Sequence, residues 1–197
     1  DSYTIERYLA TNGYAGLRAA LAQPATSVHD EVKNATVLGR GGAGFPAGTK
    51  WGLTPQEVWP RYLVVNGDES EPGTYKDRLL MERDPHQLIE GMICAAYTIQ
   101  ADLAYIFIRA EYHKAAGLLR EAIAACYEQG YLGKNILGSD YSLDMQVHSS
   151  AGRYICGEET ALISSLEGKR ANPRAKPPFP QVSGLWGRPT IVNNVET

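Results

Sequence analysis

The chain has 197 residues, of which 44% are hydrophobic and 21% are charged, and its formal net charge at pH 7 is −3. This length and apolar content suit one globular domain with a hydrophobic core of its own. The slightly acidic balance predicts no nucleic-acid partner and no pull toward anionic membranes, and no apolar run is long enough to insert directly into a bilayer.

The three cysteines, Cys94, Cys126 and Cys156, are far apart in the sequence and show no paired metal-binding spacing. We therefore expect no metal site within these residues, neither an iron–sulfur cluster nor a structural zinc, and a reducing compartment. Cys94 and Cys126 are typical of small buried residues on Ala-rich helices. Cys156 stands beside charged residues, so a catalytic thiol is the alternative there.

Two short helical patterns near the N-terminus, at 13–22 and 27–36, lead us to interpret residues 1–38 as an N-terminal helical segment. Residues 39–197 are expected to form one α/β domain. Its predicted strands are 61–66, 103–109 and 141–148, and its predicted helices are 74–83, 85–99, 114–128 and 158–166. This alternation predicts a mainly parallel, Rossmann-like sheet flanked by helices, with ligands at the carboxyl ends of the strands.

A glycine-rich loop follows the N-terminal segment, with Gly39, Gly41, Gly42 and Gly44 placed within six positions. Such a loop lets the backbone approach a ligand closely, and its free N–H groups can hold a phosphate or lie against a flat ring. The charged and aromatic residues Arg40, Phe45 and Lys50 stand within or beside it. The segment therefore predicts a nucleotide or flavin site.

The same loop matches the dinucleotide fingerprint G-x-G-x-x-G only formally. Just two apolar residues, Val37 and Leu38, precede it in place of a full strand, and Phe45-Pro46 falls where the phosphate-binding helix would begin. We therefore expect an atypical glycine loop. An ordinary Rossmann site and a plain surface loop are the alternatives.

An acidic turn ends the first predicted strand, where Asn66 is followed by Asp68, Glu69, Ser70 and Glu71. Like charges this close repel one another, so a purely structural turn gains nothing from them. Carboxylates at a strand end are suited to accept hydrogen bonds from ribose hydroxyls, a flavin ring or a nicotinamide amide. A solvated acidic turn and a metal site are the alternatives.

A second glycine-bearing turn, with Tyr154, Gly157, Glu158 and Glu159, opens the helix predicted at 158–166. Its N–H groups, aromatic ring and carboxylates suit a nucleotide contact, and simple capping of the helix by the two glutamates is the alternative.

Two further segments near the C-terminus offer ligand-binding groups. The Pro-rich stretch 169–180 presents Lys176 and Phe179 from a stiff backbone, with a solvated linker as the alternative. Asn193 and Asn194 supply amide groups that no hydrophobic pattern explains.

Together these motifs resemble the flavin-bearing, NADH-oxidising subunit of respiratory complex I, a module shared with NAD-linked hydrogenases and formate dehydrogenases. The resemblance runs from about residue 5 to the C-terminus, with the motifs in the same order. The segments that carry it are 39–51, 66–78, 152–166, 167–180 and 192–197.

The resemblance implies a non-covalent FMN with NADH stacked on it, and no catalytic side chain, with Glu71 as a candidate to position the nicotinamide. The implied FMN contacts are Gly39, Arg40, Gly41, Lys50, Asn66, Asp68, Glu69, Gly157, Glu158, Val192, Asn193 and Asn194. The implied NADH contacts are Gly42, Phe45, Lys50, Glu71, Tyr154, Glu159, Lys176 and Phe179. Gly44 and Ser70 complete the set of candidate cofactor-binding residues. Leu53 departs from the family members that carry an aromatic residue there.

The resemblance also implies an NADH dehydrogenase of the quinone-linked, proton-translocating type, in which FMN receives hydride and passes single electrons to iron–sulfur clusters. The expected partners are a thioredoxin-like [2Fe–2S] subunit and further iron–sulfur subunits, in the cytoplasm or mitochondrial matrix and peripheral to the inner membrane. The family's β-rich and [4Fe–4S] domains are absent from this chain. The alternatives are the diaphorase module of a hydrogenase or formate dehydrogenase, a flavin-free NAD(P)-binding domain, and an assembly module that lost its flavin.

Overall fold

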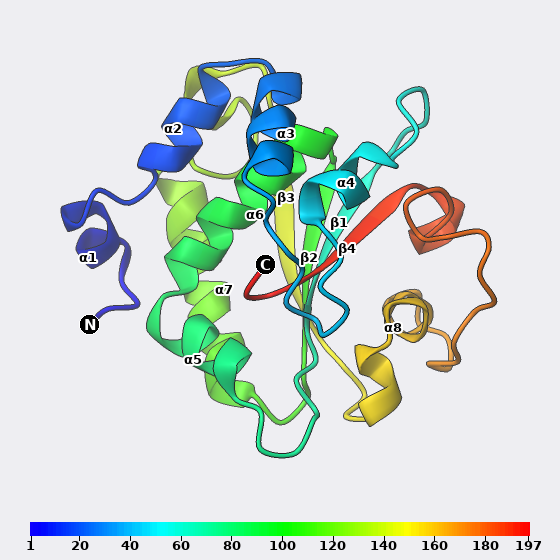
Figure 1. The fold of residues 1–197 in the computed structure, drawn as a ribbon. Helices are drawn as coiled ribbons and strands as arrows, with labels where there is room; N and C mark the ends of the chain where they lie inside the picture. Colours follow the sequence, from blue (N-terminus) through cyan, green and yellow to red (C-terminus); the bar gives the residue numbers. More distant parts are fainter.

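The computed structural model describes all residues 1–197 and has a four-stranded parallel sheet at its centre (Figure 1). The strands are β1 (Tyr62–Gly67), β2 (Leu103–Ile108), β3 (Asp144–Ser149) and β4 (Thr190–Asn194). Their order is β3-β2-β1-β4, and each pair of neighbours is parallel. The prediction of a parallel α/β fold is therefore confirmed.

The order of the strands reverses between β1 and β4. From β1 the chain moves outward through β2 to β3, and it then returns to place β4 on the other side of β1. In open parallel sheets, ligands bind in the crevice outside the carboxyl ends of the strands at such a reversal. Asn66 and Asn194, which are register partners, stand at those ends.

Helices cover the two faces of the sheet unequally (Figure 1). On one face lie α5 (Lys76–Arg83), α6 (Pro85–Ile99) and α7 (His113–Glu128), and on the other lies α8 (Glu159–Leu166). The core follows this division, because Leu63 and Val65 of β1 join a cluster of 31 buried residues on the first face, whereas Val64 joins a cluster of 8 on the second. This alternation is the period of two expected of a strand.

The N-terminal helices α1 (Ile5–Ala10), α2 (Ala15–Leu21) and α3 (Ala25–Asn34) pack on α6 and its neighbours. Tyr14 and Leu17 are fully buried in the larger core cluster. The sequence patterns did not indicate α1, whose six residues are too few for a clear helical period. The division at residue 38 remains a prediction.

Four short elements complete the chain and fell outside the predicted patterns. They are the helix α4 (Ala47–Gly52) and the 3-10 helices η1 (Ile136–Gly138), η2 (Tyr154–Gly157) and η3 (Leu185–Gly187). The first, α4, begins directly after Pro46, the residue that we used as an argument against an ordinary Rossmann site. It packs on α3 so closely that a Cβ at Gly48 would stand 2.6 Å from the Cα of Lys33.

Candidate functional site

Two adjoining cavities of about 180 and 490 Å³ open where β1 and β4 end. Gly41, Asn66, Gly157 and Asn194 line both. All the predicted cofactor-binding residues except Lys176 and Phe179 lie in their walls. The smaller cavity is lined by Gly39, Gly41, Gly44, Phe45, Lys50, Asn66, Gly157, Glu159, Val192, Asn193 and Asn194. The larger is lined by Arg40, Gly41, Gly42, Asn66, Asp68, Glu69, Ser70, Glu71, Tyr154, Gly157, Glu158 and Asn194.

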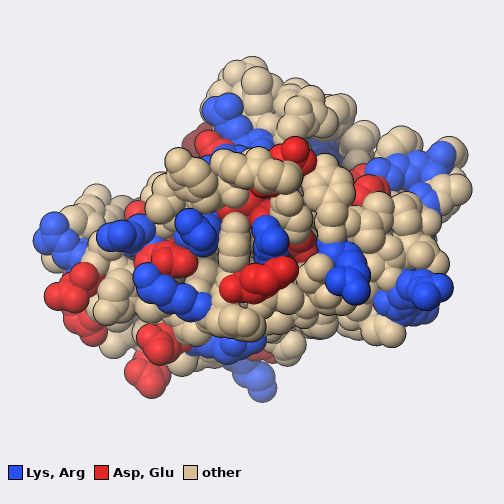
Figure 2. Space-filling model, turned by 90° about the horizontal axis from the view of Figure 1, so that it is seen from below, with Lys and Arg blue, Asp and Glu red and all other residues tan.

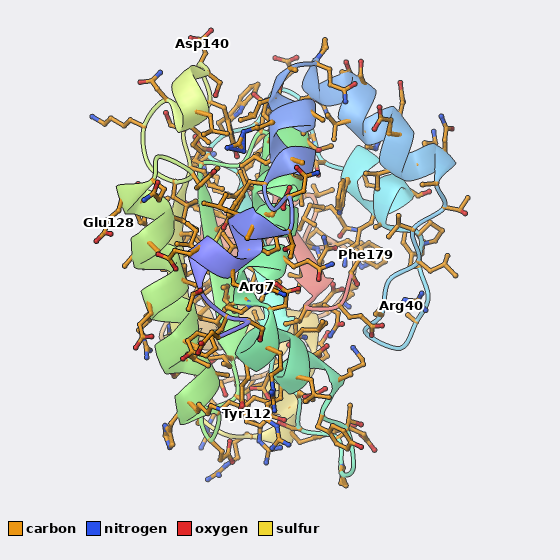
Figure 3. The ribbon with its side chains drawn as sticks, turned by 90° about the vertical axis from the view of Figure 1, so that its left-hand side faces the viewer. Arg7, Arg40, Tyr112, Glu128, Asp140 and Phe179 are labelled. Atoms are coloured by element: carbon orange, nitrogen blue, oxygen red, sulfur yellow. The ribbon has the colours of Figure 1, made fainter.

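The glycine loop stands out from the body of the protein, as the position of Arg40 in Figure 3 shows. An isolated antiparallel bridge between Leu38 and Pro46 closes the loop at its base. Gly42 and Gly44 have φ values of +116° and +64°, a region that L-residues rarely adopt. The loop therefore follows a two-residue bridge and not a strand of the sheet. In this respect it differs from the glycine loop of an ordinary Rossmann unit, which follows a strand.

The acidic turn after β1 is held in place by its own polar groups. The Asn66 side-chain amide donates to Gly157 O at 2.8 Å, which ties this turn to the one after β3. Ser70 Oγ donates to Asp68 Oδ1 at 2.6 Å. Asp68 Oδ2 is buried and has no hydrogen-bond partner in the protein. Because Asp68 lines the larger cavity, this oxygen is a ready acceptor for a ligand hydroxyl or N–H.

Glu69 has a structural task in the same turn. Its two carboxylate oxygens accept from the backbone N–H groups of Asp77 and Arg78, at 2.9 and 3.1 Å, and so cap the start of α5. The Tyr112 hydroxyl, at the lower edge of Figure 3, also donates to it at 3.1 Å. Burial and the nearby Glu69 carboxylate raise the pKa of Tyr112. A direct contact between Glu69 and FMN remains a prediction.

Tyr154 and Glu71 join the two turns at the edge of the larger cavity. The Tyr154 hydroxyl donates to Glu71 Oε2 at 2.8 Å, although 68% of the tyrosine is exposed. Both residues were predicted to contact NADH. The Tyr154 hydroxyl donates its proton to Glu71, whose other carboxylate oxygen is left available for a ligand donor.

A chain of alternating charges borders the smaller cavity. Lys50 Nζ lies 3.5 Å from Glu159 Oε2, and Lys176 Nζ lies 2.6 Å from Glu159 Oε1 and 3.3 Å from Glu158 Oε1. Burial lowers the pKa of Lys50, although Glu159 opposes this shift. Lys176 does not line the cavities, but it pairs with Glu158 and Glu159, which do. Phe179 is half exposed and lines neither cavity.

Two side chains in the cavity wall, Lys76 and Asp77, were missed by the sequence analysis. They form the first turn of α5. The sequence could have indicated them, because this helix was predicted to begin shortly after the acidic turn. Thr74, Ile155 and Thr197 also line the site without having been predicted. Apolar or small residues in loops carry no pattern that distinguishes a cavity wall from an ordinary surface.

Charges of both signs mix over the face that carries the strand ends (Figure 2). This face has no extended patch of one sign in that view. None of the helices combines the length and the apolar character that crossing a bilayer requires.

Glu158 caps α8, which leads to a prediction about acid stability. Its Oε2 accepts from the N–H groups of Thr160 and Ala161 at 3.0 and 2.9 Å. Burial alone would raise the pKa of Glu158, but hydrogen bonds from the Thr160 hydroxyl and the Ala161 N–H, together with Lys176, lower it overall. A folded-state pKa below the unfolded value stabilises the fold above the unfolded pKa, and the benefit disappears as pH falls through the folded pKa. Urea unfolding should therefore separate wild type from Glu158→Gln at about pH 7 and bring them together near about pH 3. A gap that is the same at both pH values would contradict this role.

Comparisons with known proteins agree with this geometry. The family model of the Nuo51 FMN-binding domain matches residues 32–197. The chain is 55% identical to an NADH-quinone oxidoreductase subunit of Aquifex aeolicus and 57% identical to its namesake from Escherichia coli, over 99% and 98% of its own length. It covers only 46% and 44% of those relatives. A solved NAD⁺-reducing [NiFe]-hydrogenase in its air-oxidised state superposes with a TM-score of 0.79 at 41% identity, covering 90% of this chain and 30% of that one.

Proposed function

We propose, from the premise that this chain belongs to the Nuo51 FMN-binding domain family, that it holds FMN and NADH in the two adjoining cavities. The observation that carries the proposal is the buried, unpartnered oxygen of Asp68, a residue in the wall of a cavity that Gly41 and Gly42 also line. A flat ring needs such a bare surface, and a ribityl chain or ring N–H supplies the missing donor.

The residues divide the work between the two ligands. Gly41 and Gly42 offer backbone to the flavin, while Asn66, Asp68 and Asn194 present amide and carboxylate groups at the strand ends. Bound FMN would supply the chemistry, accepting hydride from NADH and releasing electrons one at a time. The protein contributes binding and orientation, which favour a near-attack arrangement of the two rings.

The residues around the smaller cavity serve the dinucleotide in this proposal. Phe45, which is half exposed beside the loop, offers a stacking surface. Glu159 offers a carboxylate to ribose hydroxyls, and Lys50 and Lys176 hold it in place through ion pairs. Glu71 accepts from the nicotinamide amide through the carboxylate oxygen that Tyr154 leaves available.

The activity of the whole protein goes further than these residues. The chain spans less than half the length of the curated relatives it matches. We therefore extend the proposal to the whole protein, with electron delivery to iron–sulfur clusters, quinone as the final acceptor, and partner subunits. The named relatives support a subunit of an NADH-quinone oxidoreductase. This protein would work beside a [2Fe–2S] subunit, peripheral to the membrane, in the cytoplasm or the mitochondrial matrix. The structural similarity to an NAD⁺-reducing hydrogenase supports a diaphorase module as the second candidate.

Flavin reconstitution tests the proposal directly. The purified chain is titrated with FMN and then desalted, and we expect a yellow protein with an absorbance band near about 450 nm that NADH bleaches under anaerobic conditions. Retained NADH binding without any flavin would instead support a flavin-free NAD(P)-binding domain. Failure to bind either ligand would overturn the proposal.

Substitutions at the dinucleotide side test the assignment of the glutamates. We expect Glu159→Gln or Glu71→Ala to raise the KM for NADH about tenfold, because a carboxylate accepts two ribose or amide hydrogen bonds better than its replacement does. Glu159→Gln should also improve use of NADPH, since it removes a charge that repels a 2′-phosphate. Steady-state assays with an artificial acceptor compare both nucleotides. Unchanged Michaelis constants in both variants would refute the assignment.

A further inference from the structure

A second polar network, separate from the ion pairs of Glu159, joins the first turn of α5 to the end of β4. Lys76 Nζ donates to Asn194 Oδ1 at 2.9 Å and to Asp77 Oδ1 at 2.7 Å. Asn194 Nδ2 donates to Asp77 Oδ2 at 2.8 Å, and Lys76 also pairs with Glu196 at 3.0 Å. Both polar ends of the Asn194 amide therefore have fixed partners, which define its orientation.

Lys76 also contributes a positive charge to the wall of the larger cavity. The wall of the larger cavity contains the carboxylates of Asp68, Glu69, Glu71, Asp77 and Glu158, against the two basic side chains of Arg40 and Lys76. Arg40 is exposed on the projecting loop (Figure 3), whereas Lys76 is half-buried and held by its partners. Lys76 is thus the cation with a fixed position in a wall dominated by negative charge.

A carboxylate-rich wall is a poor environment for a flavin. FMN carries a phosphate, and its ring gains electron density on reduction, so uncompensated carboxylates would weaken both its binding and its reduction. A fixed ammonium in the same wall opposes that field at short range, where screening by salt is weakest.

We propose that Lys76 is a positioning residue of the flavin site, which orients the Asn194 amide and sets the reduction potential of the bound flavin through its fixed charge. This inference rests on the proposed FMN function. It assigns a role to a side chain that the sequence motifs did not single out.

The test compares FMN affinity and flavin potential in the full chain. Lys76→Met, which keeps the length but removes the charge, is titrated with FMN by fluorescence, and its potential is measured against redox dyes at saturating FMN. We expect about tenfold weaker FMN binding, as for loss of a charged hydrogen bond, and a more negative flavin potential. Lys76→Arg should restore both values. Lys76→Gln provides a second neutral variant if Lys76→Met folds poorly.

Lys114→Met is the matched control, because Lys114 also lies in the first turn of a helix and pairs with Glu82 at 2.8 Å, but lines neither cavity. It should behave as wild type. An unchanged potential in the neutral Lys76 variants, even with lower thermal stability or weaker FMN binding, means a merely structural role and overturns the inference. If wild type itself takes up no FMN, the proposed function fails first, and this inference fails with it.

Discussion

Gly41→Val should strongly weaken FMN binding while leaving the fold intact. Gly41 lines both cavities and therefore stands where they meet. Its φ lies outside the left-handed region, and a Cβ built there would meet only the Cβ of Asn194, at an ordinary contact distance of 3.7 Å. A valine is thus tolerated by the backbone, and its methyl groups occupy the space that a flat ring requires.

The size of the effect follows from the overlap of the valine methyl groups with the space that the ring would occupy. We expect Gly41→Val to weaken FMN binding by about a hundredfold or more, and Gly41→Ala by less, in fluorescence titrations. Gly117→Val is the control, since Gly117 on α7 faces open space away from the cavities. Thermal unfolding should show both valine variants folded. Wild-type FMN affinity in Gly41→Val would place the flavin elsewhere and remove the basis of the proposed site.

Gly42 and Gly44 would give a less informative result. Their positive φ angles make any side chain strained, so a loss of FMN binding there would mix steric blocking with a changed loop. The contrast between neighbouring glycines was invisible in the sequence, where Gly39 to Gly44 looked equivalent. The structure separates them: Gly42 and Gly44 need glycine for their backbone angles, a Cβ at Gly39 would lie 3.0 Å from Phe45 O, and Gly41 alone has neither constraint.

The strands show what local patterns predict well. The strands β1 and β2 were predicted because each is a short apolar run, and β3 was predicted because apolar and polar residues alternate along it, in agreement with its single buried residue, Met145. The fourth strand, β4, was missed because its apolar part is only Ile191 and Val192 before two asparagines. Residues 190–194 form a strand because they pair with β1, which lies more than a hundred residues earlier in the chain, and local sequence patterns do not show such a pairing.

The site shows the same division between local pattern and long-range packing. The glycine loop and the turns after β1 and β3 line the two cavities, since a parallel sheet gathers the ends of its strands, whereas the Pro-rich segment with Lys176 and Phe179 does not. The sequence does not predict the direction of individual side chains: the adjacent residues Asp68 and Glu69 differ, because Asp68 has a buried oxygen without a partner and Glu69 caps α5. The roles of the predicted contacts therefore remain predictions, while their gathering around two cavities is a property of the structure.

The N-terminal helix α2 is capped by a residue that is distant in the sequence, the carboxylate of Glu90 on α6. Tyr14 begins α2 in the left-handed conformation, with φ of +60°, and no side chain of α2 caps that helix. Glu90 takes this part from 76 positions away, since Oε2 accepts from Tyr14 N at 2.8 Å and Oε1 accepts from Leu17 N at 2.9 Å. The Tyr8 hydroxyl donates to the same carboxylate.

Glu90→Ala should therefore lower the free energy of unfolding by about 3 kcal/mol, because it leaves two helix N–H groups and a hydroxyl without their acceptor. Glu90→Gln, which keeps one strong acceptor, should lose about half of that, and Tyr8→Phe about 1 kcal/mol. Urea unfolding followed by circular dichroism measures each value. Glu82→Ala is the control, because it breaks an exposed ion pair with Lys114 and should cost less than about 1 kcal/mol. If Glu90→Ala is no more destabilising than Glu82→Ala, the start of α2 is held by packing of Tyr14 and Leu17 alone, and the carboxylate is not the cap.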